Sequence, residues 1–176
     1  MNTGEAKAWF NQAESDLRAA TALRDRPPPM TSEDVGCHVA AMCAQAIEKS
    51  IKAYVIVNGA TPSLGHRPDK YLPQLLTKND PLLRYKDHYR HLSKLFDLHT
   101  RRTVAALLDL TPGGKGSLTD VTNTEYPWKV NGAWKGTPVG SSHFGDGQLD
   151  VWLKLAKRVS DMLHKLLIAA QRGADL

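Results

Sequence analysis

The chain has 176 residues, of which 41% are hydrophobic and 23% are charged. This length and composition fit one globular domain with a sizeable core. No apolar run approaches the roughly 20 residues of a membrane-spanning helix, and the first ten residues lack the pattern of a signal peptide. Cys37 and Cys43 would lie about 9 Å apart on one helix, too far for a disulfide. We therefore expect a reduced, cytoplasmic protein that spans no membrane.

The excess of basic side chains is concentrated in the middle third of the chain. Lys and Arg number 23 against 18 Asp and Glu, which gives a net charge of +5. Residues 65–135 carry a net charge of +5, whereas residues 1–64 carry −1 and residues 136–176 carry +1. A basic surface in the middle third suits phosphate groups or an acidic partner. A solvated basic face is the alternative that composition leaves open.

Apolar residues three and four positions apart predict the first two helices. One runs from about Gly4 to Arg24 and ends before the prolines at 27–29, which cannot continue a helix. The second begins at Thr31 or Ser32, residue types that cap helix N-termini. It ends at Asn58-Gly59, a plausible left-handed stop.

Three further helices follow in the second half of the chain. Prolines between residues 60 and 80 leave room for a short helix from about Tyr71 to Leu76. Asp80-Pro81 has the pattern of a cap followed by proline, and predicts one long helix to about Leu110. The last helix covers about Gln148 to Arg172. The sequence therefore predicts an all-α bundle of four long helices and one short one.

Segment 111–147 separates the last two helices and holds 8 of the 13 glycines. We treat residues 1–176 as one domain, with 111–147 as a long loop within it. Asn131-Gly132 inside this loop is a strong cue for a β-hairpin. A two-residue turn would place Lys129 opposite Trp134, and Trp128 opposite Lys135. These four side chains could stack on RNA through an aromatic and basic ribbon, or the tryptophans could seal the loop against the bundle.

The second helix carries the stretch Ala44-Gln45-Ala46-Ile47-Glu48-Lys49-Ser50-Ile51-Lys52-Ala53. This stretch resembles the signature helix of HEPN domains (higher eukaryote and prokaryote nucleotide-binding). Tyr126-Pro127, ahead of the last helix, matches a pair common in one branch of that family. The resemblance covers about residues 6–168 and implies a HEPN-like helical bundle.

Polar residues of the signature helix have two possible roles. Gln45, Glu48, Lys49 and Lys52 could line a polar groove toward a nucleotide, and we expect them, with His88, among the nucleotide- or RNA-binding residues. Alternatively, Glu48 and Lys52 are four positions apart with the acid first, which favours a helical ion pair with a structural role.

The resemblance implies two possible kinds of function. Some HEPN proteins are nucleotide- or nucleic-acid-binding modules, often encoded beside a minimal nucleotidyltransferase. Others are metal-independent ribonuclease toxins or defence effectors, marked by an Arg followed after four to six residues by a His. Neutral His can move a proton to or from the ribose, and Arg can hold the phosphate. Two such pairs usually meet across a dimer in this family, so we expect a homodimer.

Two Arg and His pairs match this spacing, Arg84 with His91 and Arg158 with His164. Seven positions along a helix return to nearly the same face, whereas six leave side chains about 120° apart. We therefore favour Arg84 as the phosphate ligand and His91 as the acid or base, and keep Arg158 and His164 as the second candidate pair. His143, in the glycine-rich loop, could approach a bound nucleotide.

These features together predict a nucleotide- or RNA-interacting module of a toxin–antitoxin or defence system. One alternative is a metal-independent ribonuclease that uses an Arg and His pair. Another is a protein-interaction module that docks a nucleotidyltransferase antitoxin. We predict no metal site, because His88 and His91 have no cysteine nearby to complete a ligand set. We also predict no cofactor, and no Walker-type glycine loop appears.

Overall fold

The computed structural model describes residues 3–26, 29–62, 65–77, 85, 87–111, 122, 124–125, 128–130 and 133–172. The elements, in chain order, are α1 (Thr3–Arg24), α2 (Ser32–Val57), η1 (Pro68–Tyr71), α3 (Leu72–Leu75), α4 (His88–Leu95), α5 (Leu98–Asp109), β1 (Trp128–Val130), β2 (Ala133–Gly136), η3 (Ser142–Phe144) and α6 (Asp146–Arg172). The predicted all-α class is therefore confirmed. Within the described part of the chain, no helix is both long and apolar enough to cross a membrane.

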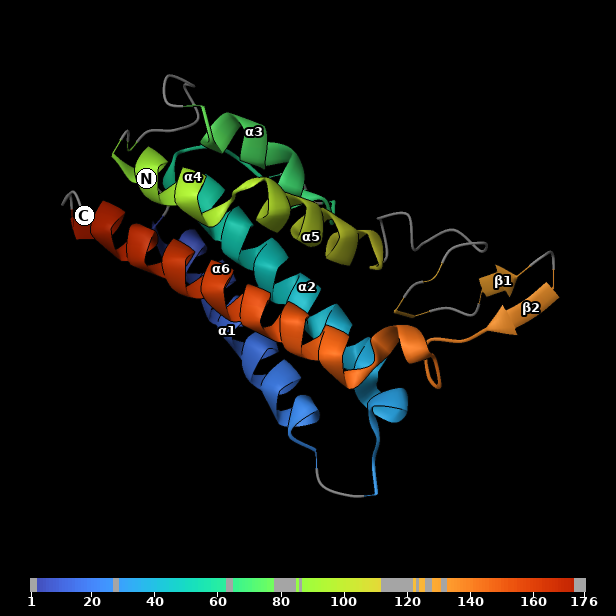
Figure 1. Cartoon of the computed structure of the whole chain (residues 1–176). Helices are drawn as coiled ribbons and strands as arrows, with labels where there is room; N and C mark the ends of the chain where they lie inside the picture. Colours follow the sequence, from blue (N-terminus) through green and yellow to red (C-terminus); the bar gives the residue numbers. More distant parts are fainter. Residues whose placement is uncertain are drawn as a thin grey trace.

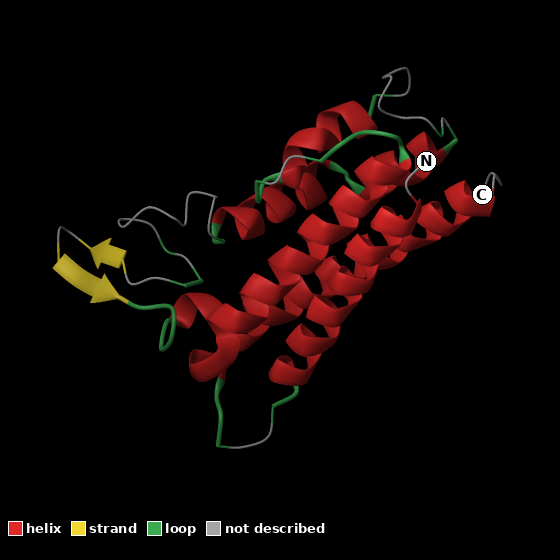
Figure 2. Cartoon of the chain, turned by 180° about the vertical axis from the view of Figure 1, so that it is seen from behind, coloured by secondary structure: helices red, strands yellow, loops and turns green. Residues whose placement is uncertain are grey.

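Helix α2 is the centre of the bundle (Figure 1). It packs against α1, α5 and α6, while α6 also contacts α1, α4 and α5. The start of α1 and the ends of α2 and α6 lie at the same end of the bundle, as both views show (Figures 1 and 2). Because α6 lies between α1 and the α4–α5 segment, it presents two flanks to two different neighbours.

The core is built from apolar residues that recur at steps of three and four along the helices. Its buried residues include Ala6, Phe10, Ala13 and Ala20 of α1, and Leu149, Trp152, Val159, Leu163 and Leu167 of α6. The predicted ends of α2 are confirmed too. The Thr31 backbone N–H donates to Asp34 Oδ2 over 2.6 Å, and Gly59, just after the helix, has φ of +89°.

The single helix predicted from Asp80 to Leu110 is wrong, because the chain turns between α4 and α5. Phe96 leaves the helical region with φ of −100° and ψ of 54°. Asp97 then caps α5 through a 2.7 Å hydrogen bond from the Thr100 backbone N–H. Leu92, Phe96 and Leu107 are nevertheless all buried, so the apolar period continued across the break and concealed it. Residues 80–84 lie outside the described part.

The end of the 111–147 segment packs onto α2. Phe144 of η3 is buried and lies so close to Gly36 that a Cβ there would be 2.4 Å from the Phe144 carbonyl oxygen. The Gly140 N–H, one residue beyond Val139, donates to the Glu33 carbonyl oxygen over 2.7 Å. These contacts fix the turn that leads into α6.

Strands β1 and β2 form an antiparallel hairpin that stands away from the helices (Figure 2). Lys129 is opposite Trp134, as the two-residue turn predicts. Trp128 is opposite Gly136, because the register shifts between Trp128 and Lys129. The predicted pairing of Trp128 with Lys135 is therefore wrong by one position.

Candidate functional site

Glu48 and Lys52 of the signature helix form a buried ion pair. Lys52 Nζ lies 2.7 Å from Glu48 Oε1, and the two side chains are only 2% and 7% exposed. His66 Nδ1 lies 3.0 Å from the other Glu48 oxygen, and the Lys52 ammonium is 5.1 Å from the centroid of the Trp9 ring. This burial favours the structural role over direct contact with a ligand.

Gln45 and Lys49 join α2 to α1 instead. The Lys49 ammonium donates to Asp16 Oδ2 and, over 3.3 Å, to Gln45 Oε1. Gln12 of α1 donates to the other Asp16 oxygen over 3.1 Å. Gln45 and Lys49 are partly exposed, so the structure leaves them accessible at one edge while they hold two helices together.

His88 is in the interior of the protein. Its Nδ1 and the Tyr54 hydroxyl are 2.8 Å apart in a buried hydrogen bond, and its ring stacks on Tyr85 with 5.2 Å between centroids. Burial raises the pKa of Tyr54, which therefore stays a neutral phenol. The position of His88, like those of Glu48 and Lys52, favours a structural role.

The structure divides the Arg158 and His164 pair between the two flanks of α6. Arg158 Nη2 donates to the Lys94 carbonyl oxygen of α4 over 3.4 Å. His164 stacks on Phe10 of α1 with 4.1 Å between centroids, and its Nδ1 is 3.7 Å from Glu14 Oε1. Because six positions rotate a side chain far around the helix, these two residues do not act together within one chain.

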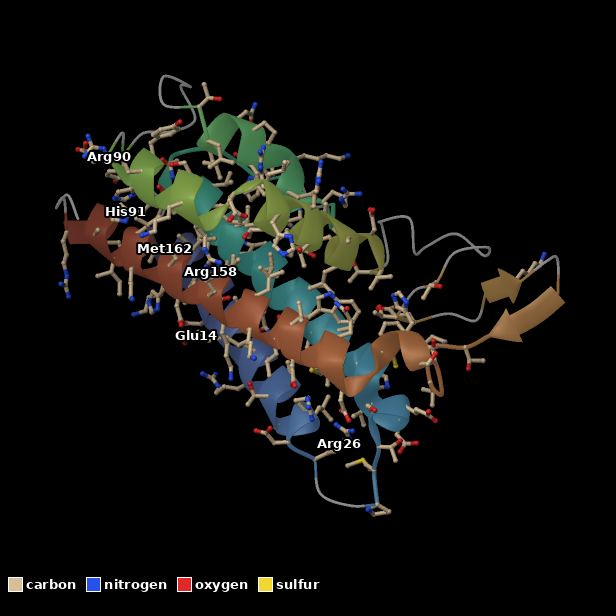
Figure 3. All side chains as sticks on the ribbon, viewed as in Figure 1. Glu14, Arg26, Arg90, His91, Arg158 and Met162 are labelled. Atoms are coloured by element: carbon tan, nitrogen blue, oxygen red, sulfur yellow. The ribbon has the colours of Figure 1, made fainter. Side chains whose placement is uncertain are left out.

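His91 and Arg158, one from each predicted pair, lie instead on the neighbouring helices α4 and α6. Lys94, which Arg158 contacts, follows His91 by three residues, or about 4.5 Å along α4. Figure 3 shows His91, Met162 and Arg158 along the side of α6 that faces α4, whereas Glu14 lies on the α1 side. We call the surface formed by His91, Lys94, Arg158 and Met162 the α4–α6 seam. Arg84 lies outside the described residues.

The His91 imidazole and the Arg158 guanidinium, the two groups of the seam able to act on RNA, are available to a ligand. The His91 imidazole is half-buried, and neither a hydrogen bond nor an ion pair joins it to the residues that the structure describes. Arg158 is exposed, and among the described residues no carboxylate lies within ion-pair distance of it. An Arg without a carboxylate partner keeps most of its five donors for an incoming anion.

The charge around the seam is mostly positive. Arg90, Lys94, Lys154 and Arg158 are exposed on α4 and α6. Two acids lie near these cations: Asp97, whose pKa is lowered chiefly by its hydrogen bonds with Thr100 and further by the positive charge of Arg158, and Asp150, whose pKa is lowered chiefly by its hydrogen bond with Arg24 and further by Lys154. This excess of exposed cations favours a ligand with several phosphate groups over a protein surface of mixed charge.

The four hairpin residues named as RNA-binding candidates are described mainly through their backbone. The backbones of Trp128, Lys129, Trp134 and Lys135 belong to β1 and β2. Of these four residues, only Lys129 has a described side chain, which is partly exposed. No group of three or more His, Cys, Asp or Glu side chains able to hold a metal ion is found within the described ranges.

Sequence reasoning missed the seam because its two halves come from helices more than 60 residues apart. Spacing within one helix found His91 and Arg158 separately and assigned each a different partner. The packing of α4 on α6 places them on neighbouring helices, whereas the basic middle third and the Arg84–His91 spacing pointed to α4 alone.

The fold and the signature helix define the class of this chain, an all-α domain of the HEPN type. The HEPN domain family model matches residues 6–101, more than half of the chain. The chain therefore belongs to the HEPN domain family, which relates it to nucleotide- and RNA-associated modules at the level of the family. Neither among curated proteins nor among solved structures is a similar chain found.

Proposed function

We propose that this HEPN domain binds RNA through its phosphates along the α4–α6 seam. The observation that carries the proposal is the proximity of Arg158 to the α4 turn that holds His91 and Lys94. Guanidinium groups bind phosphate through two parallel hydrogen bonds, and the neighbouring exposed cations would extend the contact to adjacent phosphates. Such binding weakens as salt rises, because bound cations are displaced from the nucleic acid.

Fluorescence anisotropy with a labelled single-stranded RNA tests this proposal. Replacing Arg158 with Gln should weaken binding at least several-fold and make its salt dependence shallower by roughly one phosphate contact. The Lys157→Gln variant is the matched control, since Lys157 is also an exposed cation of α6 but lines its α1 flank. Equal losses in both variants, or binding that salt does not weaken, would reject the seam as the RNA site.

A second candidate function, a metal-independent ribonuclease, is favoured by the same proximity. In such a reaction the ribose 2′-oxygen attacks the adjacent phosphorus, the bond to the 5′-oxygen breaks, and a 2′,3′-cyclic phosphate forms. Arg158 would stabilise the charge that develops on the phosphate oxygens. His91 would either accept the 2′-hydroxyl proton or donate a proton to the leaving 5′-oxygen.

One imidazole can perform only one of these two proton transfers in a single step. The second would come from His91 of another copy, if the domain dimerises as the family resemblance implies. Arg84 remains a candidate second phosphate ligand beside His91. Arg158 thus takes the role that spacing alone assigned to Arg84.

Cleavage of a mixed-sequence RNA in EDTA tests the ribonuclease candidate. The His91→Ala variant should lose cleavage by at least 100-fold, the usual contribution of a general acid or base. His164→Ala should cleave like the wild type, because its ring packs on the α1 flank. Undiminished cleavage by His91→Ala would remove the catalytic assignment while leaving the binding proposal intact.

The biological setting is also part of the proposal. A place in a toxin–antitoxin or defence system, a homodimer, and docking to a nucleotidyltransferase are supported by the family alone. Light scattering of the purified chain tests the dimer, for which we expect twice the 19.4 kDa chain mass. Co-purification with the product of a neighbouring gene tests the docking partner.

A further inference from the structure

A recess beside the start of α6 has a composition that the seam does not explain. It is a cavity of about 590 Å³ between α5, η3 and the start of α6, which we call the α5–α6 pocket. Its described lining residues are His99, Arg102, Thr103, Ala106, Asp109, Leu110, Thr122, His143, Gln148 and Trp152. This volume falls within the range of small-ligand sites.

The rim of the pocket is basic. His99 and Arg102 from α5 and His143 from η3 are all exposed. Neither an ion pair nor a hydrogen bond joins the Arg102 guanidinium to any residue that the structure describes. Asp109, the one acid among the described lining residues, is already bound by Arg67 through its Oδ1. The pocket therefore presents uncompensated positive charge at its mouth.

We call the apolar lining residues Ala106, Leu110 and Trp152 the floor of the pocket. Trp152 and Leu110 are largely buried, and Ala106 is exposed. The Trp152 ring lies 6.2 Å from the ring of His143, so two aromatic rings bound one side. Gln148 adds an amide that can both donate and accept hydrogen bonds. An apolar, aromatic floor beside a cationic rim and one amide suits a planar heterocycle that carries a phosphate.

We propose that the α5–α6 pocket holds a single unpaired nucleotide, with its phosphate at Arg102 and its base between His143 and Gln148. Proteins recognise single-stranded RNA by stacking splayed-out bases on aromatic side chains and reading their edges with amides. The proposal rests on the RNA-binding function and deepens it. Trp152 and Arg158 are six residues apart, which separates them by about 9 Å along α6 and by about 120° around it. A strand on the seam would therefore have to pass part of the way around α6 to place one nucleotide in the pocket.

The nucleotide could be free or part of a strand, and the experiment distinguishes these sources. Calorimetric titrations use the four nucleoside 5′-monophosphates, a single-stranded RNA and a fully paired duplex of the same sequence. The variants are Arg102→Gln, which removes the cation, and Ala106→Trp, which fills the pocket from an exposed position without changing charge. Arg18→Gln, an exposed arginine on α1, is the control.

We expect at least tenfold weaker binding of single-stranded RNA in both pocket variants, unchanged binding in Arg18→Gln, and weaker binding of the duplex than of the single strand. Binding of a free monophosphate that Ala106→Trp abolishes would identify the free nucleotide as a source. Single-strand binding that Ala106→Trp leaves intact overturns the pocket, as does the absence of binding by every probe.

The same titrations test RNA binding at the seam and nucleotide binding in the pocket separately. If Arg158→Gln binds RNA like the wild type while Ala106→Trp does not, the seam is rejected and the pocket stands. If Arg158→Gln weakens binding and Ala106→Trp does not, the seam stands alone. Circular dichroism of each variant confirms that the helical fold is retained.

Discussion

Arg158 of α6 donates a hydrogen bond to the carbonyl oxygen of Lys94 on α4, with 3.4 Å between the two atoms. This contact places one guanidinium nitrogen at the Lys94 carbonyl, three residues after His91 on α4, on the flank of α6 that faces α4 (Figure 3). The opposite flank of the same helix carries His164 against α1. The packing of α4 on α6 therefore decides which arginine can cooperate with which histidine.

The Glu48–Lys52 pair should be a major contributor to stability. Replacing Glu48 with Gln leaves the Lys52 ammonium buried without its carboxylate, which should lower the free energy of unfolding by about 3–5 kcal/mol. Urea unfolding measures this loss. Adding Lys52→Met in the same chain should restore part of it, because the uncompensated charge is then removed.

Glu14→Gln is the control for that experiment. Glu14 pairs with Arg18 at 3.9 Å on the surface, so its loss should change the free energy of unfolding by less than about 1 kcal/mol. A Glu48→Gln variant as stable as Glu14→Gln would show that the buried pair does not stabilise the fold. The ligand-contact role of Glu48 would then regain support.

Gly36 should tolerate no side chain. A Cβ at this position would lie 2.4 Å from the Phe144 carbonyl oxygen, so Gly36→Ala must push η3 away from α2. We expect a loss of about 1–3 kcal/mol of stability, as for other overpacked sites. Because His143 belongs to η3, nucleotide binding at the α5–α6 pocket should weaken as well.

Gly147→Ala provides the comparison in thermal unfolding. Nothing lies within 4 Å of a Cβ at Gly147, and alanine in the first turn of α6 should stabilise the helix by up to about 1 kcal/mol. If Gly36→Ala melts at or above the temperature of Gly147→Ala, the close approach of η3 to α2 is refuted.

The cysteines should be inert in the folded protein. Burial raises the pKa of Cys43 to about 12, and burial also raises the pKa of Cys37. Since the thiolate is the reactive form, neither residue should be alkylated by iodoacetamide at pH 8 until urea unfolds the chain. Mass spectrometry reads the number of labels, and rapid labelling without urea would contradict the buried positions.

Asp97 should make the free energy of unfolding depend on pH. Its hydrogen bonds with Thr100 hold its pKa below the ordinary value, so the folded state binds this proton more weakly than the unfolded state. The resulting stabilisation is present above the unfolded pKa of about 3.9. It is lost as the pH falls through the lower, folded pKa.

Thermal unfolding between pH 2.5 and pH 7 tests this linkage. Asp97→Asn can still cap α5 but does not titrate, so its melting temperature should fall less steeply below about pH 4 than that of the wild type. Identical slopes would mean that the Asp97 cap does not contribute to acid sensitivity.

Local signals allowed much of the fold to be predicted. Thr31 and Gly59 mark the ends of α2 because caps and left-handed stops are properties of a few adjacent residues. The break at Phe96 and Asp97 escaped because a single aspartate costs a helix interior only a fraction of a kcal/mol, and the apolar period continued through it. Whether Asp97 caps a new helix depends on how α5 turns against α2 and α6, which adjacent residues do not reveal.

The candidate site was less predictable than the fold. Spacing found the Glu48–Lys52 pair, but its burial depends on Trp9 and His66 from other segments. Spacing also paired Arg158 with His164, although their helix separates them onto different flanks. Contacts between distant helices, such as that of Arg158 with Lys94, need the packed structure.

The most direct test of the α4–α6 seam follows the histidine side chains during RNA binding. Imidazole resonances of ¹⁵N-labelled protein, assigned with His91→Ala and His164→Ala, would be recorded during titration with a short single-stranded RNA. The seam predicts that the His91 resonances shift progressively while those of His164 stay in place. Shifts at His164 with an unchanged His91 would place the RNA on the α1 flank and contradict this account.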